Sequence, residues 1–376
     1  MLADLLVNPH RDLTLGVRRV APAWSFHRGL SGYAAAPLVE LPQLASRLGV
    51  GTVLAKIEGD RFGLPAFKAL GASWALARAL ARRSGADATQ WSSEADLLAG
   101  AGAAGRPLVV TATDGNHGRA VARMARLAGL AATVLMPAGS APARIVAIEQ
   151  EGAEVVVIEG DYDAAVEMAR QAAAADGLLL QDTFVPGHPD PPVWVVEGYA
   201  TLFRELDEQL SGRTVDAVLV PVGVGALACA AVRHFATSSV VAVEPADAAC
   251  VLASLRAGHP VTTPGPHRSV MAGLNCGTPC ATAWPELLPG LAGAVAITDD
   301  AACAAMREFA DNAIVAGETG AASLGALLGL ADRPSDAAAL GITRNSTVLL
   351  LVTEGATDPD HYAQVVGRSP QEVASA

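Results

Sequence analysis

The stretch LVVTATDGNHGRAVARMARLAGLAATVLM, residues 108–136, decides the fold class. It opens with the apolar run 108–112, passes through a polar loop into the amphipathic segment 119–128, and closes with a second apolar run, 132–136. Apolar runs without alternating polar residues are typical of strands buried on both faces of a parallel sheet. The stretch therefore predicts a β-α-β unit with its polar loop at the carboxyl end of the first strand.

The same alternation of strands and helices recurs along the chain. Further expected strands are 155–158, 217–220, 240–243 and 348–352, and further helical patterns cover 145–150 and 226–236. Repeated β-α-β units predict an α/β fold with parallel-rich sheets flanked by helices. A polar, glycine-rich region at 84–105 and a break near 209–214 divide the chain. We therefore expect two lobes, a large domain from residues 1–85 and 212–376 and a smaller α/β domain from 86–211.

Composition narrows the class of protein. Of the 376 residues 51% are hydrophobic, which predicts a large buried core, and the net charge of −12 disfavours binding to nucleic acid or anionic membranes. The first residues lack the cationic lead of a secretory signal, and the apolar stretch 217–232 is interrupted by Pro221, Gly223 and Gly225. We expect a cytoplasmic protein with no membrane partner. The five cysteines and eight histidines show no metal-ligand spacing, so no metal site is expected.

A lysine in the segment RFGLPAFKALG, residues 61–71, is the first candidate for chemistry. Lys68 stands just before a helical pattern, where the positive end of the helix dipole disfavours an ammonium group. Its neighbours Phe67, Ala69 and Leu70 are apolar, which favours a neutral amine able to form an imine. An ordinary solvated lysine is the alternative, and the local residues leave both open.

The polar loop of the opening stretch is the second candidate. It carries Thr113, Asp114, Asn116 and His117, with glycines that permit close backbone approach to a ligand. A helix cap by Asp114 or Asn116 is the alternative, although a cap accounts for one polar residue and not for four.

Two further loops follow predicted strands. PVGVGALA, residues 221–228, offers backbone amides at a helix N-terminus and so predicts a phosphate site. With Glu244 about twenty residues on, the same loop also matches a dinucleotide fingerprint. Thr353 follows the run 348–352 and offers a neutral hydroxyl, or a hydroxyl bound by local backbone. An imine-forming lysine, a phosphate loop and a ring-nitrogen partner together meet the needs of pyridoxal phosphate.

The chain resembles the diaminopropionate ammonia-lyases of the fold type II, tryptophan-synthase-β-like group of pyridoxal-phosphate enzymes. The segments that carry the resemblance run in family order from about residue 56 to 360: RFGLPAFKALGASWA, TATDGNHGRAVA, QDTFVPGHPDPPVWVVEGYATL, VPVGVGALA, VVAVEPADAACVLASLRAG, MAGLNCGTP, GETGAASLGAL and LVTEGATDP. RFGL-x-AFK and TATDGNHGR are distinctive, whereas serine and threonine dehydratases share only a looser lysine, GNHG and glycine-loop pattern. Two departures stand out, Lys56-Ile-Glu-Gly-Asp60 where the family reads KDESK, and the proline-rich stretch 186–192.

The resemblance implies a role for each matching residue. Lys68 is implied as the Schiff-base lysine, Asn116 as a hydrogen-bond partner of the cofactor's phenolic oxygen, and Thr353 as the partner of its pyridine nitrogen. Asp114 and Asp182 are implied as acids around the substrate. The phosphate ligands are implied to be Gly223, Val224, Gly225 and Ala226. Cys250 and Cys276 are implied as a pair near the site entrance, although a cytosolic setting favours free thiols. A homodimer is implied as well.

The expected activity is elimination of ammonia from 2,3-diaminopropionate, giving pyruvate and ammonia. The two aspartates favour it because a second substrate amine suits an additional carboxylate. A serine/threonine dehydratase or a cysteine-synthase-like enzyme of the same cofactor group is one alternative. A nicotinamide-dependent dehydrogenase would use Glu244 and leave Lys68 unexplained, and a non-catalytic protein on this fold would not need Lys68 together with Asp114.

Overall fold

The computed structural model describes the whole chain except residues 17–19, 114, 161 and 175. The chain forms two compact units, which we name after their sheets. The seven-stranded unit comprises residues 1–19, 35–60 and 203–376, and the four-stranded unit comprises residues 20–34 and 61–202.

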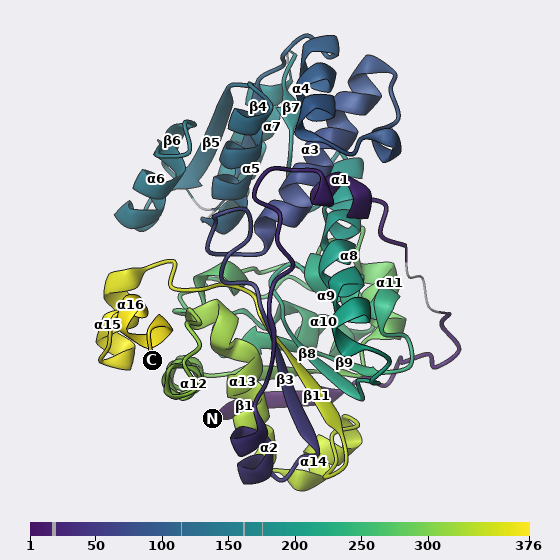
Figure 1. Cartoon of the computed structure of the whole chain (residues 1–376), viewed down its shortest axis with the longest axis vertical. Coiled ribbons are helices and arrows are strands. Elements are labelled where there is room, and N and C mark those ends of the chain that lie inside the picture. Colours follow the sequence, from purple (N-terminus) through teal and green to yellow (C-terminus); the bar gives the residue numbers. More distant parts are fainter. Residues whose placement is uncertain (17–19, 114, 161, 175) are drawn as a thin grey trace. The chain divides into compact units, whose positions relative to one another are not determined.

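In the seven-stranded unit the strands follow the order β1-β10-β9-β8-β11-β3-β2. Figure 1 labels β1, β3, β8, β9 and β11 of this sheet. Their bounds are β1 Leu2–Val7, β2 Leu38–Glu40, β3 Thr52–Ile57, β8 Ala217–Pro221, β9 Ser239–Pro245, β10 Gly293–Ile297 and β11 Thr347–Val352. The five central strands are parallel, and β1 and β2 pair antiparallel at the edges. Every residue of β8, β9 and β10 is buried, as continuous apolar runs predict.

Helices cover this sheet and bury its core. They are α2 Pro42–Leu48, α9 Ala226–His234, α10 Cys250–Ala257, α11 Trp284–Gly290, α12 Asp299–Asp311, α13 Glu318–Ala331, α14 Pro334–Ala339, α15 Pro359–Val366 and α16 Pro370–Ala374, with short 3-10 helices at Ala246–Ala248 and Ala272–Leu274. Helix α13 packs on β8 and β11, so that Leu327 joins Leu219 and Leu350 in the core.

The strand order of this sheet places two predicted site loops together. The chain advances from β8 through β9 to β10 and then returns to the other side of β8 to form β11. The carboxyl ends of β8 and β11 therefore flank a topological switch point, where ligands bind in open α/β sheets. Gly223–Ala226 follows β8, and Thr353 follows β11.

In the four-stranded unit all strands are parallel, in the order β6-β5-β4-β7. The bounds are β4 Val109–Ala112, β5 Ala132–Pro137, β6 Glu154–Ile158 and β7 Leu178–Leu179, with helices α1 Trp24–Arg28, α3 Lys68–Ser84, α4 Glu94–Ala103, α5 Asn116–Leu127, α6 Pro142–Glu149 and α7 Tyr162–Ala173 and a 3-10 helix at Ala88–Gln90. Helix α8, Asp190–Leu210, belongs to this unit as far as residue 202. The chain passes from β4 through β5 to β6 and then returns to the other side of β4 to form β7. The carboxyl ends of β4 and β7 therefore flank a second switch point.

The predicted α/β class and parallel sheets are confirmed, and each predicted strand corresponds to one of β4, β5, β6, β8, β9 and β11. The units divide the chain differently from the expected domains, since residues 61–85 group with the four-stranded sheet. The reason is that α3 packs against α4 and α5. The glycine-rich region expected to separate the lobes contains α4, which Ser93 caps by accepting from the Asp96 amide.

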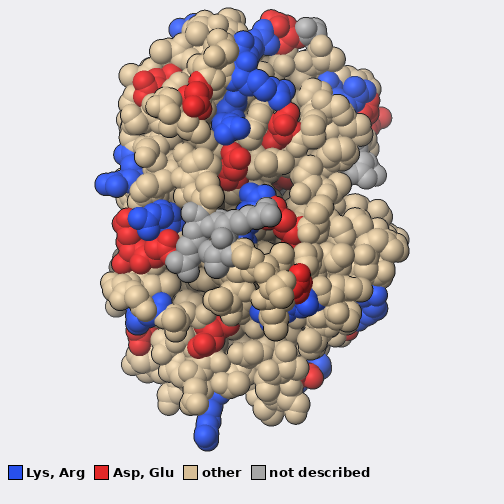
Figure 2. All heavy atoms as spheres, turned by 90° about the vertical axis from the view of Figure 1, so that its right-hand side faces the viewer, with Lys and Arg blue, Asp and Glu red and all other residues tan. Residues whose placement is uncertain are grey.

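Acidic and basic side chains are interspersed on the face of the molecule drawn in Figure 2, among a larger area of uncharged residues. Within the described part of the chain, none of the helices combines the length and apolar character needed to span a bilayer.

Candidate active site

Lys68 and Asp182 form an ion pair in the four-stranded unit. Lys68 is the first residue of α3, as the sequence predicted, and Asp182 follows β7. The lysine Nζ donates to Asp182 Oδ2 at 2.8 Å, and the two side chains are only 19% and 11% exposed. Burial alone would raise the pKa of Asp182, but the charge and hydrogen bond of Lys68, with His117 nearby, hold it well below its ordinary value. Asp182 is therefore ionised at neutral pH.

His117, in the first turn of α5, faces the same carboxylate. Its Nε2 lies 3.0 Å from the Leu180 carbonyl, which can only accept, so Nε2 carries the hydrogen and Nδ1 is a bare acceptor. Burial lowers the pKa of His117, which keeps the ring neutral. Nδ1 lies 3.8 Å from Asp182 Oδ2 and has no hydrogen-bond partner among the described residues. Two acceptors that face each other at this distance can share one cationic donor, such as an ammonium group.

Gln181 fixes the position of Asp182. Its Oε1 accepts from Thr111 Oγ1 at 3.0 Å and from the Ala112 amide at 3.1 Å, while its Nε2 donates to the Ala112 carbonyl at 3.0 Å and to Tyr162 Oη at 2.8 Å. The buried amide thus ties the short strand β7 to the end of β4. Nothing in the sequence singled out Gln181, because its partners Thr111 and Ala112 lie about seventy residues away.

Tyr199 lies beside Lys68 and was also missed by sequence reasoning. Burial raises the pKa of this phenol, although the charge of nearby Lys68 acts to lower it, so the phenol stays protonated. Glycines allow this approach: a Cβ on Gly71 would lie 2.6 Å from a ring carbon of Tyr199, and one on Gly198 would lie 2.3 Å from the Leu70 carbonyl. The pair lets α3 and α8 pack closely, with the Phe67 ring 4.7 Å from the Tyr199 ring.

The remaining predictions in this unit concern the loop after β4. Asn116 opens α5 and is half-buried. Asp114 lies outside the described residues. Thr113 Oγ1 accepts from the Gly115 and Gly118 amides at 3.0 and 3.2 Å, at the start of α5. The alternative of a cap by Asp114 lies outside the described residues.

In the seven-stranded unit the predicted phosphate loop is shaped by its glycines. Gly225 has φ +99° and caps α9, and a Cβ there would lie 2.5 Å from a methyl carbon of Leu287. A Cβ on Gly223 would lie 3.0 Å from Cys276 Sγ and 3.2 Å from the Gly273 carbonyl. A side chain at Gly225 would be strained, and one at Gly223 would be tightly packed. The two glycines leave this part of the loop without side chains, as an anion site at a helix N-terminus needs.

Thr353 supplies a buried hydroxyl at the other side of the switch point. It is 2% exposed, and its Oγ1 has no hydrogen-bond partner among the residues the structure describes. The alternative of a hydroxyl bound by local backbone therefore does not hold in this structure. A buried hydroxyl without a partner is costly, and a bound ligand is one explanation for it.

Two thiols border the predicted phosphate loop. Cys250 Sγ donates to the Gly223 carbonyl at 3.7 Å, and Cys276 Sγ lies beside the same residue. The Cys250 thiol is free in this structure, and burial raises its pKa.

Glu244 is a structural residue. Its two oxygens accept from the amides of Val251 and Leu252 at 2.7 and 2.8 Å, at the N-terminus of α10. It is fully buried, and burial raises the pKa of its carboxyl to about 8. Both oxygens are therefore occupied, which removes the ribose ligand that a dinucleotide fingerprint requires. Among the described residues no group of three His, Cys, Asp or Glu side chains could hold a metal ion.

Comparison with known proteins places the chain among enzymes of one cofactor. A family model described as "Pyridoxal-phosphate dependent enzyme" matches residues 30–354. The chain is 36% identical to diaminopropionate ammonia-lyase of Escherichia coli (strain K12) over 94% of its own length and 92% of that protein. The Salmonella typhimurium enzyme of the same name is also 36% identical, over 92% of this chain and 91% of that protein. A biosynthetic L-threonine dehydratase of S. typhimurium is 34% identical over only 57% of this chain and 41% of its own.

Solved structures give the same relationship. E. coli diaminopropionate ammonia lyase in complex with D-serine superposes with a TM-score of 0.90 at 33% identity, covering 99% of this chain and 98% of that chain. The same enzyme in complex with an aminoacrylate-PLP azomethine reaction intermediate has a TM-score of 0.89 at 33% identity, covering 100% and 99%.

Proposed function

Because the chain belongs to the family of pyridoxal-phosphate-dependent enzymes, we propose that it eliminates ammonia from 2,3-diaminopropionate, giving pyruvate and ammonia. The observation that carries the proposal is the pair of acceptors next to Lys68. Asp182 Oδ2 and His117 Nδ1, 3.8 Å apart, suit a second substrate ammonium that serine and threonine lack. The similarity to diaminopropionate ammonia-lyases over nearly the whole chain supports the same substrate.

The residues present fit the cofactor. Lys68 would hold it through its amine, and Gly223, Val224, Gly225 and Ala226 would bind its phosphate through backbone amides. The unpartnered hydroxyl of Thr353 suits the ring nitrogen, and Asn116 would donate to the phenolic oxygen. When bound, pyridoxal phosphate supplies an electron sink for negative charge at the substrate α-carbon.

The protein's own groups would move and hold the protons. Lys68 Nζ, when it is not bonded to the cofactor, would be a base for the substrate α-proton. Asp182, ionised because its pKa is low, would hold the substrate's β-ammonium together with His117 Nδ1. A β-amino group leaves as ammonia only when it is protonated, so this pair would keep a proton on the leaving group. Asp114 would be a second acid at the site.

The first experiment is a visible spectrum of the purified protein before and after borohydride treatment. The proposal expects a cofactor band that reduction removes, with the added mass on Lys68, and no such label in Lys68→Ala. The second experiment measures pyruvate and ammonia from D- and L-diaminopropionate, serine and threonine. A higher kcat/KM for serine or threonine than for either diaminopropionate enantiomer would favour the dehydratase alternative and overturn the substrate assignment.

We further propose that the protein is a cytoplasmic homodimer, as its resemblance to the family implies. Sedimentation of the purified holoenzyme would test the dimer. A mass of one chain at micromolar concentration would contradict it.

A further inference from the structure

A strained turn lies just ahead of Lys68. The Arg61 amide donates to the Leu64 carbonyl at 2.7 Å and the Leu64 amide to the Arg61 carbonyl at 3.1 Å, which closes a tight turn over two residues. Phe62 and Gly63 both have positive φ, +56° and +72°. Glycine adopts this conformation freely, whereas a bulky residue such as phenylalanine does so only where surrounding contacts enforce it.

Side-chain packing provides part of that enforcement. The Phe62 ring is buried, 6.2 Å from the His27 ring and 6.1 Å from the Tyr33 ring. Arg61 is 1% exposed and donates through Nη1 to the Ala34 carbonyl at 2.9 Å. These contacts hold the Arg61 and Phe62 side chains of the turn.

Arg123 of helix α5 holds the central peptide of the turn. Its Nη1 donates to the Phe62 carbonyl at 2.9 Å, and the same atom would lie 3.5 Å from a Cβ on Gly63. Its other donors are used elsewhere, because Nε donates to Glu151 Oε2 and Nη2 donates to Glu151 Oε1 at 3.0 Å. A guanidinium bound to a carboxylate through Nε and Nη2 has a fixed plane, which directs Nη1 towards the turn.

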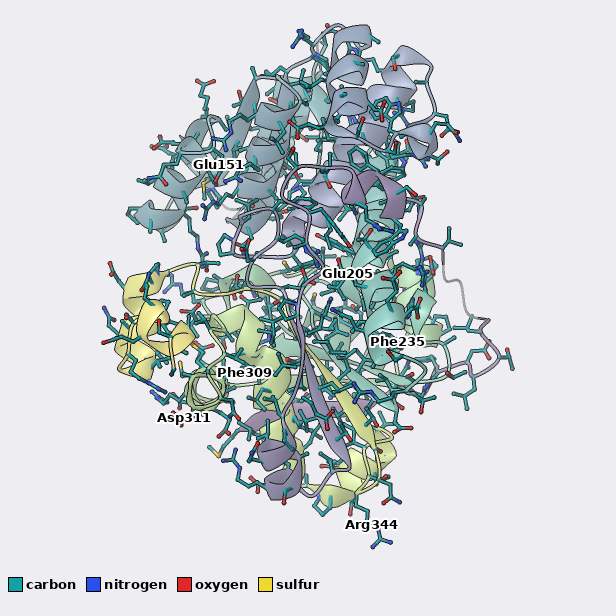
Figure 3. The ribbon with its side chains drawn as sticks, viewed as in Figure 1. Glu151, Glu205, Phe235, Phe309, Asp311 and Arg344 are labelled. Carbon is teal, nitrogen blue, oxygen red and sulfur yellow. The ribbon has the colours of Figure 1, made fainter. Side chains whose placement is uncertain are left out.

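Glu151, labelled in Figure 3, serves three arginines of the same helix. It is 3% exposed; burial would raise its pKa, but the hydrogen bonds and charges of Arg123 and Arg119 lower it. Arg119 Nε donates to it at 3.2 Å and Arg126 Nη2 at 3.0 Å. Of the three, Arg123 is the one with a hydrogen bond to the Phe62 carbonyl, so Arg126 offers a natural control.

Helix α5 also carries His117, a residue of the candidate active site. His117 lies in the first turn of the helix and faces Asp182, and Asp182 binds Lys68 Nζ. The same rigid helix thus contacts the lysine's carboxylate partner at one end and the turn that leads into the lysine's helix further along.

We propose that Arg123, oriented by Glu151, is a positioning residue that sets the Phe62–Gly63 turn and thereby the placement of Lys68 relative to Asp182. This inference rests on the proposed role of Lys68. It does not rest on the identity of the substrate, because the position of Lys68 would matter for any amino acid processed at this site.

The test compares Arg123→Lys with Arg126→Lys in the holoenzyme. Lysine keeps the positive charge beside Glu151 but cannot bind the carboxylate and the Phe62 carbonyl in one plane. A displacement of about 1 Å at a reacting group costs on the order of 10²-fold in rate. Arg123→Lys should therefore lower kcat by about 10- to 100-fold with KM within about threefold, while Arg126→Lys stays within about twofold of wild type.

Two readouts do not depend on turnover. In Arg123→Lys, deuterium uptake by the peptide that contains the Leu64 amide should rise, and the pH midpoint of the cofactor's visible band should shift. Neither should change in Arg126→Lys. If diaminopropionate proves not to be the substrate, these two readouts still decide the inference.

Equal losses of kcat in the two variants would overturn the proposal, because the effect would then belong to the Glu151 cluster as a whole. Unchanged deuterium uptake at the turn in Arg123→Lys would overturn it as well. Should Arg123→Lys fail to fold, Glu151→Gln replaces it, since a neutral amide weakens the fixed plane of Arg123. The same rise in uptake and fall in kcat are expected there, and their absence would refute the inference.

Discussion

Replacing Lys56 by methionine should destabilise the seven-stranded unit by about 3–5 kcal/mol. Lys56 lies on β3, and its Nζ is 2.6 Å from Glu205 Oε2, with both side chains 0% exposed (Figure 3 labels Glu205). The ammonium also donates to the Ala36 carbonyl at 2.6 Å and to Gln209 Oε1 at 2.9 Å.

The expected magnitude follows from what the substitution leaves behind. Methionine nearly matches the volume of lysine, so the cavity contribution is small. The Glu205 carboxylate stays buried and loses the charge and hydrogen bond of Lys56, while the Ala36 amide still donates to it at 3.1 Å. Removing one partner of a buried ion pair costs about 3–5 kcal/mol. Removing the second charge as well, in Lys56→Met/Glu205→Gln, should therefore recover about 2 kcal/mol or more of the free energy of unfolding.

The assay is urea unfolding with linear extrapolation, followed by far-ultraviolet circular dichroism. Arg213→Met is the matched control, because Arg213 pairs with Glu40 at 2.9 Å in the same unit but both side chains are about half exposed. The control should lose no more than about 1 kcal/mol. A loss in Lys56→Met no greater than that of the control would refute the reasoning, as would additive losses in the double variant.

Three further predictions follow from the site and its surroundings. Asp182→Asn should lower kcat/KM for diaminopropionate by about 10²-fold, because a hydrogen bond to a charged group contributes roughly 1.5–3 kcal/mol, and should lower it less for serine; equal losses for the two substrates would contradict the proposed ammonium site. Thr353→Val should leave the thermal unfolding of the cofactor-free protein unchanged while raising the cofactor's Kd, since the hydroxyl has no partner in the described chain; an unchanged Kd in a cofactor titration would count against its role. Glu244 has a pKa raised by burial to about 8, so the folded state binds a proton that the unfolded state has released, and stability falls as pH rises from about 5 to about 8. Glu244→Gln should remove this slope, worth up to about 4 kcal/mol at about 1.4 kcal/mol per pH unit, in urea unfolding between pH 5 and 9; parallel curves for the two proteins would exclude it.

The sequence by itself determined the α/β class and several elements of the sheets. The runs 217–220 and 240–243 lie in β8 and β9, because a strand covered by helices on both faces needs apolar residues at every position. It also predicted Lys68 at a helix start and the glycine loop before α9, since both depend on neighbours in the chain. By contrast, helix α4 lies in the region 84–105 that we expected to separate the two lobes. The only feature of the sequence that indicates this helix is the capping residue Ser93, with Asp96 three residues later.

Only the tertiary structure decided which of these residues meet. Strand β7 is two residues long, and its pairing with β4 brings Asp182 to His117 across sixty-five positions of the chain. Glu244 looked like a ribose ligand in the sequence, and it became a structural residue once the amides of α10 bound both of its oxygens. A local sequence pattern indicates which chemistry a side chain can perform, whereas strand order and helix packing determine which other side chains it contacts. Charge pairing and burial depend on distances that no spacing in the sequence encodes, so the partners of Lys68 emerged only from the fold.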